Sequence, residues 1–224
     1  MKTTVGTTAA APAAPGICRK PRGRPLSFDR DAALENAMHV FWERGYEAAS
    51  IADLTAAMGI TPPSLYTAFG DKEKLFLEAI ERYALGPGSA GPRALAEEPT
   101  ARGAIERWLR DAADELTRPC HPKGCMVVMS TTNCSVAAEH VQNALTKRRA
   151  AALAVIRSRL QHAVDDGELP AETDAKALAN FYSTIYQGMS MQAKDGASRA
   201  SLMATVDAAM RAWPALPVSS RGRA

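Results

Sequence analysis

The segment of residues 50–74 constrains the fold of this chain more than any other, because it encodes two short helices on either side of a tight turn. Ser50 is a favourable N-cap for the first of these helices. The apolar positions of that helix recur every three to four residues and share one face: Ile51, Leu54 and Met58. Gly59 accepts the left-handed backbone conformation that ends a helix sharply, and Ile60 is placed to fill the angle between the helices. This order of signals predicts a helix-turn-helix.

The second helix begins with residues typical of a first helical turn, and the residues that follow give it an inner apolar face and an outer face. Thr61 is its predicted N-cap, and Pro62 and Pro63 fit only where the missing N–H groups have no intrahelical partner. Leu65 and Phe69 lie four residues apart and are expected to face inward. The side chains left to face outward, where a recognition helix meets base edges and phosphates, are Ser64, Thr67 and Ala68, with Tyr66 at the flank.

The run T-P-P-S-L-Y-T-A-F-G-D-K-E-K-L-F resembles the end of the DNA-binding domain in the tetracycline-repressor-like (TetR) family, and the resemblance covers residues 28–83. The preceding R-G-Y-E-A-A-S is similar to the family's link between helices. It follows a helical stripe of apolar residues: Ala33, Leu34, Ala37, Met38, Phe41 and Trp42. The resemblance implies a homodimeric repressor that binds a palindromic operator in double-stranded DNA. It also implies an all-helical C-terminal domain and release by a small-molecule effector, whose identity the sequence does not give.

We expect DNA contacts from the recognition helix and from residues beside it. The helix carries no charged side chain, so direct base contacts should be few, and thymine methyl groups should touch Pro63 or Ala68. Lys72 and Lys74, at the start of the next helix, are candidates for phosphate contacts. The predicted DNA-binding residues are Arg22, Arg24, Ser50, Thr61, Pro63, Ser64, Tyr66, Thr67 and Lys72.

Positive charge is concentrated at the N-terminus. The chain carries a formal net charge of +3, yet residues 1–28 contain five basic residues and no acidic one, so the remainder is net negative. The tetrapeptide Arg22-Gly23-Arg24-Pro25 resembles the core of an AT-hook, in which an extended backbone lies in a narrow A·T-rich minor groove. We expect residues 1–27 to form a disordered basic arm that enters the minor groove. A solvated tail that aids solubility is the other interpretation.

Helical periodicity continues beyond the helix-turn-helix and predicts an all-α protein. Residues 28–84 are expected to form the DNA-binding domain, residues 85–99 a Gly- and Pro-rich linker, residues 100–215 a helical effector-binding and dimerisation domain, and residues 216–224 a tail. No stretch approaches the ~18 uninterrupted apolar residues of a membrane helix, and the N-terminus lacks the apolar core of a secretory signal. We therefore expect a cytoplasmic bacterial protein that associates with the nucleoid when it is bound to DNA, without a membrane partner.

Two long helices are expected near residues 137–165 and 174–194. In the family the last two long helices pair with their copies in a four-helix interface, so the resemblance assigns these two to the homodimer. The residues that could form a closely packed seam are Ala151, Ala152, Val155, Leu178, Tyr182, Ile185 and Gly188.

Residues 119–133 are predicted to form the wall of a ligand pocket. A Pro- and Gly-punctuated entry leads there into an apolar run that mixes methionines with polar side chains, and helices expected nearby supply aromatic partners. The predicted ligand-binding residues are Trp108, Cys125, Met126, Met129, Asn133, Tyr182, Tyr186 and Met189. The same residues could instead fill an ordinary core, as Met and aromatic residues at helical spacing often do.

The cysteines leave three interpretations open. Cys120, Cys125 and Cys134 could be small hydrophobes in a core, or thiols made reactive towards oxidants and electrophiles by His121 and Lys123. In the second case, cysteine modification would release the repressor from its operator in place of a small-molecule ligand. The cysteines could also bind a metal with a histidine, although the C-x4-C spacing is not that of a zinc knuckle. We expect no metal site and no cofactor.

Two other functions fit parts of the sequence. An architectural DNA-binding protein would use the basic arm with little dependence on base sequence or effector. An enzyme would carry a catalytic site beside the DNA-binding motif. The chain contains no Gly-rich phosphate loop, no H-E-x-x-H and no nucleophile within a known motif, so we expect no catalytic residues and no enzymatic activity.

Overall fold

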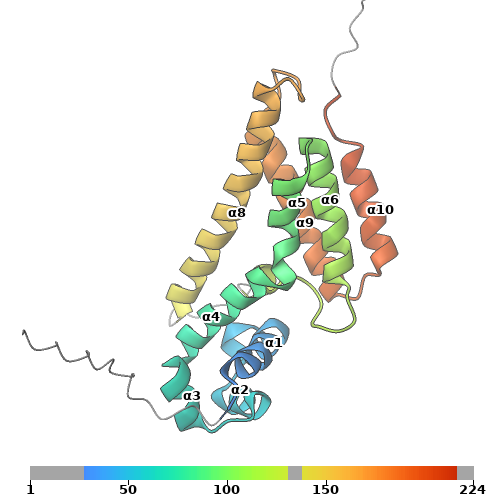
Figure 1. The fold of residues 1–224 in the computed structure, drawn as a ribbon. Coiled ribbons are helices and arrows are strands. Elements are labelled where there is room, and N and C mark those ends of the chain that lie inside the picture. Colours follow the sequence, from blue (N-terminus) through green and yellow to red (C-terminus); the bar gives the residue numbers. More distant parts are fainter. Residues whose placement is uncertain (1–27, 131–137, 216–224) are drawn as a thin grey trace, which may run out of the picture.

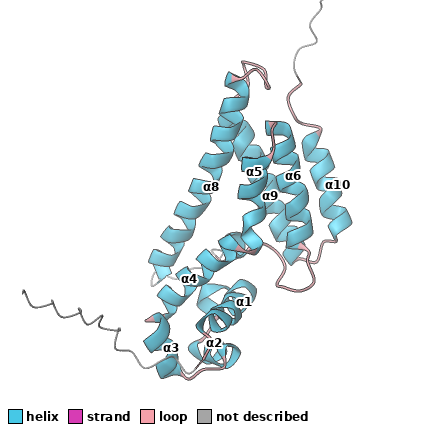
Figure 2. Cartoon of the chain, viewed as in Figure 1, coloured by secondary structure: helices cyan, strands magenta, loops and turns pink. Residues whose placement is uncertain are grey.

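The computed structural model describes residues 28–130 and 138–215, and every regular element in these two stretches is helical (Figure 2). The elements in chain order are α1 (Arg30–Ala48), α2 (Ile51–Met58), α3 (Pro62–Phe69), α4 (Lys72–Leu85), η1 (Pro87–Ser89), α5 (Ala90–Glu97), α6 (Ala101–Leu116), α7 (Met126–Met129), α8 (Glu139–Asp165), α9 (Ala175–Lys194) and α10 (Arg199–Met210). Figure 1 shows α1 to α3 at one end of the molecule, α4 leading away from them, and a larger group of helices at the other end. We call α1–α4 the N-terminal unit, and α5, α6 and α8–α10 the helical body. The predicted all-α class, with a helix-turn-helix unit before a larger helical part, is confirmed.

The helix-turn-helix forms for the local reasons that the sequence suggests. Ser50 accepts a hydrogen bond from the backbone N–H of Asp53, whose carboxylate accepts from the backbone N–H of Ser50, so α2 begins with a complete capping box. Gly59 has a φ of 66° and ends α2 in the left-handed conformation. Thr61 caps α3, and the two prolines occupy the first turn. The two residues of α3 expected to face inward are both buried: Leu65 and Phe69.

The core of the N-terminal unit lies between α1 and α4. All six residues of the apolar stripe predicted for α1 are buried. Phe41 meets the ring of Phe76 edge-on with centroids 5.0 Å apart, and Trp42 meets Tyr83 in the same way at 4.8 Å. Because α4 contributes Phe76 and Tyr83 to this core and then leads towards the body, it fixes the direction in which the helix-turn-helix is presented.

The prediction of a linker over residues 85–99 is wrong, because most of this stretch is helical and forms η1 and α5. Pro92 falls in the first turn of α5, where a missing N–H breaks no helical hydrogen bond. Ala94 is buried, and α5 packs along α6. Gly91 lies so close to Trp108 that a Cβ on it would come within 2.8 Å of the indole. Glycine in this stretch therefore permits close helix packing as well as a turn.

The helical body buries one face of each of its longer helices. Capping residues begin α6, α9 and α10, namely Thr100, Asp174 and Ser198. The turn after α8 uses Gly167 with a φ of 75°. Within residues 28–130 and 138–215, no helix is both long and apolar enough to cross a membrane.

The predicted dimer seam is wrong at Tyr182, which is fully buried inside its own chain. Its hydroxyl donates to the carbonyl oxygen of Ala209 at 3.4 Å, and its ring centroid lies 5.9 Å from that of Trp213. Burial raises the pKa of Tyr182 to about 12. Phe181, the preceding residue, is the aromatic side chain that α9 exposes.

Candidate DNA interface and effector site

The outer face of α3 presents hydroxyl groups at the end of the molecule. Tyr66 is 50% exposed, and Thr61, Pro63 and Thr67 are exposed as well. The Thr67 hydroxyl donates to the carbonyl oxygen of Pro63 at 2.8 Å, so in this arrangement Thr67 can only accept a further hydrogen bond. The hydroxyls of Thr61 and Ser64 lie 2.9 Å apart, and one donates a hydrogen bond to the other. The hydroxyl that accepts keeps its own proton, which can be donated to a base or phosphate.

Lys72 and Ser50 lie beside α3. The Lys72 ammonium stands 4.5 Å from the centroid of the Tyr46 ring, and it donates to the carbonyl oxygen of Glu47 at 3.4 Å. Burial lowers the pKa of Lys72, while the Glu47 carboxylate acts in the opposite direction. Ser50 is exposed at the start of α2. The contacts of both residues with DNA stay predictions.

Several predictions fall on residues outside the described part of the chain. They concern Arg22, Arg24 and Asn133 as site residues, Cys134 as a thiol, and the arm and the tail of the chain.

The chain between α6 and α7 joins the helical body to the N-terminal unit around Cys125. The backbone N–H of Cys125 donates to the Ser190 hydroxyl of α9 at 2.8 Å. Cys125 is 4% exposed, and its thiol lies near the hydroxyls of Tyr83 of α4 and Tyr186 of α9. Burial raises the pKa of both tyrosines well above the ordinary value, and the contact with Cys125 adds to the shift. Cys125 therefore lies where the two parts of the molecule meet.

Gly124 and His121, which precede this cysteine, hold Trp42 of α1. The indole Nε1–H of Trp42 donates to the carbonyl oxygen of Gly124 at 2.8 Å, and the indole stacks on the imidazole of His121 with centroids 4.4 Å apart. The His121 ring is fixed in turn, because its nitrogens lie 2.8 Å from a Glu115 carboxylate oxygen of α6 and 3.0 Å from the carbonyl oxygen of Pro122. We call residues 117–125 the junction segment, since its contacts connect α1 with α6 and α9 (Figure 1).

Three of the predicted ligand-binding residues meet at this junction, namely Trp108, Cys125 and Tyr186. The rings of Trp108 and Tyr186 lie with centroids 5.2 Å apart. Met126 and Met189 are fully buried and Met129 is partly buried. Tyr182 lies apart from this group, against Trp213. The assignment of these residues to a ligand stays a prediction.

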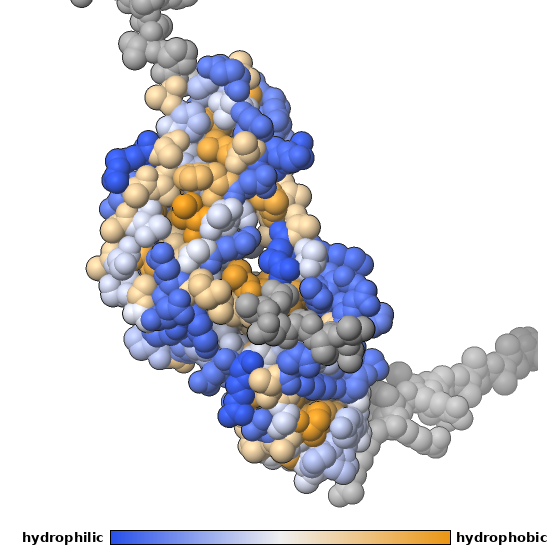
Figure 3. Space-filling model, turned by 180° about the vertical axis from the view of Figure 1, so that it is seen from behind, coloured by the Kyte–Doolittle hydropathy of each residue, from blue (hydrophilic) through white to orange (hydrophobic). Residues whose placement is uncertain are grey.

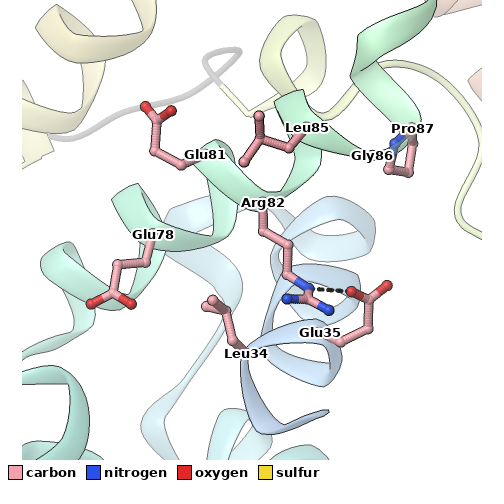
Figure 4. A pocket seen from close by; sticks show the side chains of 8 residues that line it. All are labelled: Leu34, Glu35, Glu78, Glu81, Arg82, Leu85, Gly86 and Pro87. Carbon is pink, nitrogen blue, oxygen red and sulfur yellow. Dashed lines mark hydrogen bonds and ion pairs between the residues drawn. The ribbon is translucent and has the colours of Figure 1, made fainter. Parts of the chain in front are cut away.

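Two surface hollows lie away from that group. One of about 530 Å³ is bounded by α1 and α4, where Arg82 points towards Glu35 and forms an ion pair with it while Leu85 lines the wall (Figure 4). The other, of about 540 Å³, lies where the start of α9 meets the chain after α10 and includes Phe181. Neither hollow is lined by a predicted ligand-binding residue.

The sequence interpretation missed the partners that connect the junction segment to its surroundings. Trp42 and Tyr83 appear in the sequence only as members of apolar helical stripes, and Ser190 appears as one polar residue on a long helix. Gly124 was the available signal, because a glycine before a buried cysteine marks a place where two backbones can approach closely. A Cβ on Gly124 would lie 2.9 Å from the carbonyl oxygen of Ser190.

The described cysteines are both free thiols, Cys120 exposed and Cys125 buried. Among the described residues, no group of three or more His, Cys, Asp or Glu side chains is arranged to hold a metal ion. The interpretations of Cys125 as a structural thiol or as a reactive thiol both fit its place at the junction.

Comparison with known proteins matches both parts of the chain to one family. The family model described as bacterial regulatory proteins, tetR family, matches residues 33–79, and that described as tetracyclin repressor-like, C-terminal domain, matches residues 101–213. The chain is 38% identical to the HTH-type transcriptional repressor ComR of Escherichia coli K12 over 88% of this chain and 95% of ComR. It is 27% identical to the repressor BdcR of the same organism, over 82% and 88% of the two chains.

A solved structure extends the comparison to a DNA complex. The TetR family regulator CifR, carrying three cysteine substitutions and bound to a 26-base-pair operator, matches with a TM-score of 0.82 and 45% identity over 86% of this chain and 100% of the CifR chain. The helix-turn-helix geometry, the helical body and these matches agree with one another. This chain therefore belongs to the TetR family and is a DNA-binding transcriptional regulator.

Proposed function

We propose that this protein is a homodimeric repressor that leaves a palindromic operator when Cys125 is modified or when a small molecule binds beside it. The observation that carries the proposal is the position of this buried residue: its backbone binds Ser190 of the body, the preceding Gly124 binds Trp42 of the N-terminal unit, and its thiol lies near Tyr83 and Tyr186. ComR and BdcR, both repressors by name, support the direction of control. The CifR complex with operator DNA supports the target.

Modification would add volume to the thiol in a place that is already packed. Extra atoms in a well-packed core cost about 1–3 kcal/mol, and neighbouring groups move to relieve that cost. Two groups near Cys125 could move. One is Tyr83, whose displacement would shift α4, and the other is the junction segment, which binds Trp42 of α1. Either movement would change how α3 is presented to DNA. A coupling free energy of about 1–3 kcal/mol corresponds to about a 5- to 150-fold change in operator affinity.

A non-covalent effector would act at the same place by a related route. Trp108 and Tyr186 offer apolar ring surface beside Cys125, and Ser190 offers a polar atom. A ligand that separates these rings would bind better to the state in which the junction segment has moved. That differential affinity is what would shift the protein away from its operator.

The test compares thiol variants on a defined duplex. A palindromic duplex is selected from a random library with the wild-type protein, and its affinity is measured before and after treatment with N-ethylmaleimide or hydrogen peroxide. We expect the treated wild type to bind at least about fivefold more weakly and Cys125→Ser to keep its affinity. Cys120→Ser is the matched control, because Cys120 is the exposed one of the two described thiols, and it should respond like the wild type. Release of Cys125→Ser by the same treatment would exclude this thiol as the trigger.

The proposed homodimer rests on an apolar face that the body leaves exposed. The side chains that α9 turns outward at helical spacing are Ala177, Phe181, Thr184, Gly188 and Met191. On α8, which packs along α9, the exposed small and apolar residues include Ala151, Ala152 and Val155. Figure 3 shows hydrophobic surface over the part of the molecule that holds the body. Two such faces related by a two-fold axis would form a four-helix interface.

Charge placed on this face should separate the two chains. Phe181 is 38% exposed, and Phe181→Glu would bury two carboxylates near the two-fold axis. We expect monomers in sedimentation at a concentration where the wild type is dimeric. Ala208→Glu, on the exposed face of α10, is the control and should leave the dimer intact. A dimeric Phe181→Glu variant would place the interface elsewhere.

A further inference from the structure

We infer that Arg30 is a positioning residue for operator recognition, which holds the C-terminal end of α3 in the orientation that reads DNA. The inference rests on the proposed role of α3 as the recognition helix.

Arg30 joins three helices through one guanidinium group. It is the first residue of α1, and its Nη2 donates to the carbonyl oxygen of Ala68 in α3 at 3.3 Å. The same nitrogen pairs with a carboxylate oxygen of Glu78 in α4 at 2.7 Å. Its Cζ atom lies 4.4 Å from the centroid of the ring of Phe69, and Phe69 is the last residue of α3. The planar group therefore stacks on one residue of α3 while it binds the backbone of another.

Helix α3 needs this support because little of it is buried. It has eight residues, and its buried side chains are Leu65 and Phe69, which lie four apart on one line along the helix. Burial along a single line fixes where the helix touches the core but restrains rotation about that line weakly. The capping hydrogen bond that Thr61 accepts from the backbone N–H of Ser64 lies within α3 itself and does not tie the helix to its neighbours. Arg30, by contrast, ties the C-terminal end of α3 to α1 and α4.

The bond to Ala68 also meets a need of the helix end. The last carbonyl groups of a helix lack intrahelical donors, and a cation there interacts favourably with the helix dipole. The backbone N–H of Gly70 donates to the carbonyl oxygen of Tyr66, and that of Asp71 to Phe69. Arg30 donates to the Ala68 oxygen between them.

Loss of this restraint should affect base readout more than attraction to phosphates. Hydrogen bonds to base edges weaken steeply when distance or angle departs from the optimum, so a small rotation of α3 would disturb the contacts of Ser64 and Thr67. Attraction to the phosphate backbone depends on charge and is far less sensitive to such a rotation. A positioning role therefore predicts a loss of discrimination between operator and unrelated DNA.

The experiment measures affinity for the selected palindrome and for a scrambled duplex of the same composition across a salt series. Arg30→Gln should bind the palindrome up to about fivefold more weakly, with unchanged affinity for the scrambled duplex and an unchanged salt slope. Arg30→Lys should recover part of the discrimination, because it keeps the charge beside Glu78. Glu78→Gln keeps Arg30 but removes its ionic partner. It should lose less of the discrimination between the two duplexes than Arg30→Gln does.

The matched control is Arg82→Gln. Arg82 also ties α4 to α1, through Glu35, and its side chain is 35% exposed against 37% for Arg30, but this ion pair involves no residue of α3. It should leave discrimination unchanged. Equal loss on both duplexes with a slope lowered by about 0.9 would make Arg30 a phosphate contact and overturn the inference. Unchanged discrimination in Arg30→Gln, or an equal loss in Arg82→Gln, would overturn it too. Equal affinity of the wild type for the palindrome and the scrambled duplex would instead count against α3 as the recognition helix.

Discussion

Gly124→Ala should destabilise the protein more than alanine at another glycine with the same backbone conformation. Gly124 has a φ of 81°, and the left-handed conformation costs a non-glycine residue about 1–2 kcal/mol. In addition, the new Cβ would lie 2.9 Å from the carbonyl oxygen of Ser190 and 3.3 Å from Cγ of Met129. Overpacking of this kind adds about 1–3 kcal/mol, so the expected total loss in the free energy of unfolding is about 2–5 kcal/mol.

Gly167→Ala is the matched control, because Gly167 has a φ of 75° and open space within 4 Å of its Cβ position. It should cost only the backbone share, about 1–2 kcal/mol. Urea unfolding of both variants and the wild type, followed by tryptophan fluorescence at one protein concentration, gives the comparison. Equal losses in the two variants would refute the reasoning, because they would show that the approach of residue 124 to α9 carries no energetic weight.

Three further predictions concern the DNA-binding end of the molecule. Hydrogen bonds from Ser50 and the neighbouring Arg44 lower the pKa of Asp53 to about 2, so its stabilising contribution is present above pH 3.8 and lost as pH falls through about 2. Asp53→Asn should remove that part of the acid-dependent loss of unfolding free energy, and an unaltered pH profile would contradict this. Ser64→Ala and Tyr66→Ala should weaken operator binding while the fold and the dimer persist. Unchanged binding by both at moderate salt would remove α3 from the interface. Deleting residues 1–26 should reduce the magnitude of the slope of log K against log salt by about 0.9 for each phosphate that the arm neutralises, up to ~4 per subunit, and equal slopes would make the arm a spectator.

The helix-turn-helix was predictable because its signals act over a few residues. The cap at Ser50, the turn at Gly59 and the cap at Thr61 each specify a local backbone conformation, and each is found in the structure. The inward positions of α1 followed from their spacing in the same way. Local chemistry was misleading at residues 85–99, where Gly and Pro suggested a linker. Packing against α6 and Trp108 outweighs that tendency and forms α5.

The junction segment was not predictable, because its contacts join residues that are distant in sequence. Trp42 and Gly124 are separated by 82 positions, and Cys125 and Ser190 by 65. No periodicity indicates that a tryptophan on α1 will find a carbonyl oxygen after α6. The seam prediction was wrong at Tyr182 for a related reason: composition alone does not set the rotational phase of a helix, and Phe181 faces outward where Tyr182 was expected.

Hydroxyl-radical footprinting of the full-length protein on the selected palindrome tests the central claim most directly. Sequence-specific recognition by two copies of α3 predicts two protected blocks about one helical turn apart, centred on the dyad of the palindrome. It also predicts that scrambling the half-sites at constant composition abolishes the pattern. Protection that instead follows A·T-rich runs, whatever their sequence, would contradict operator recognition by α3 and would favour an architectural protein that binds through its N-terminal arm.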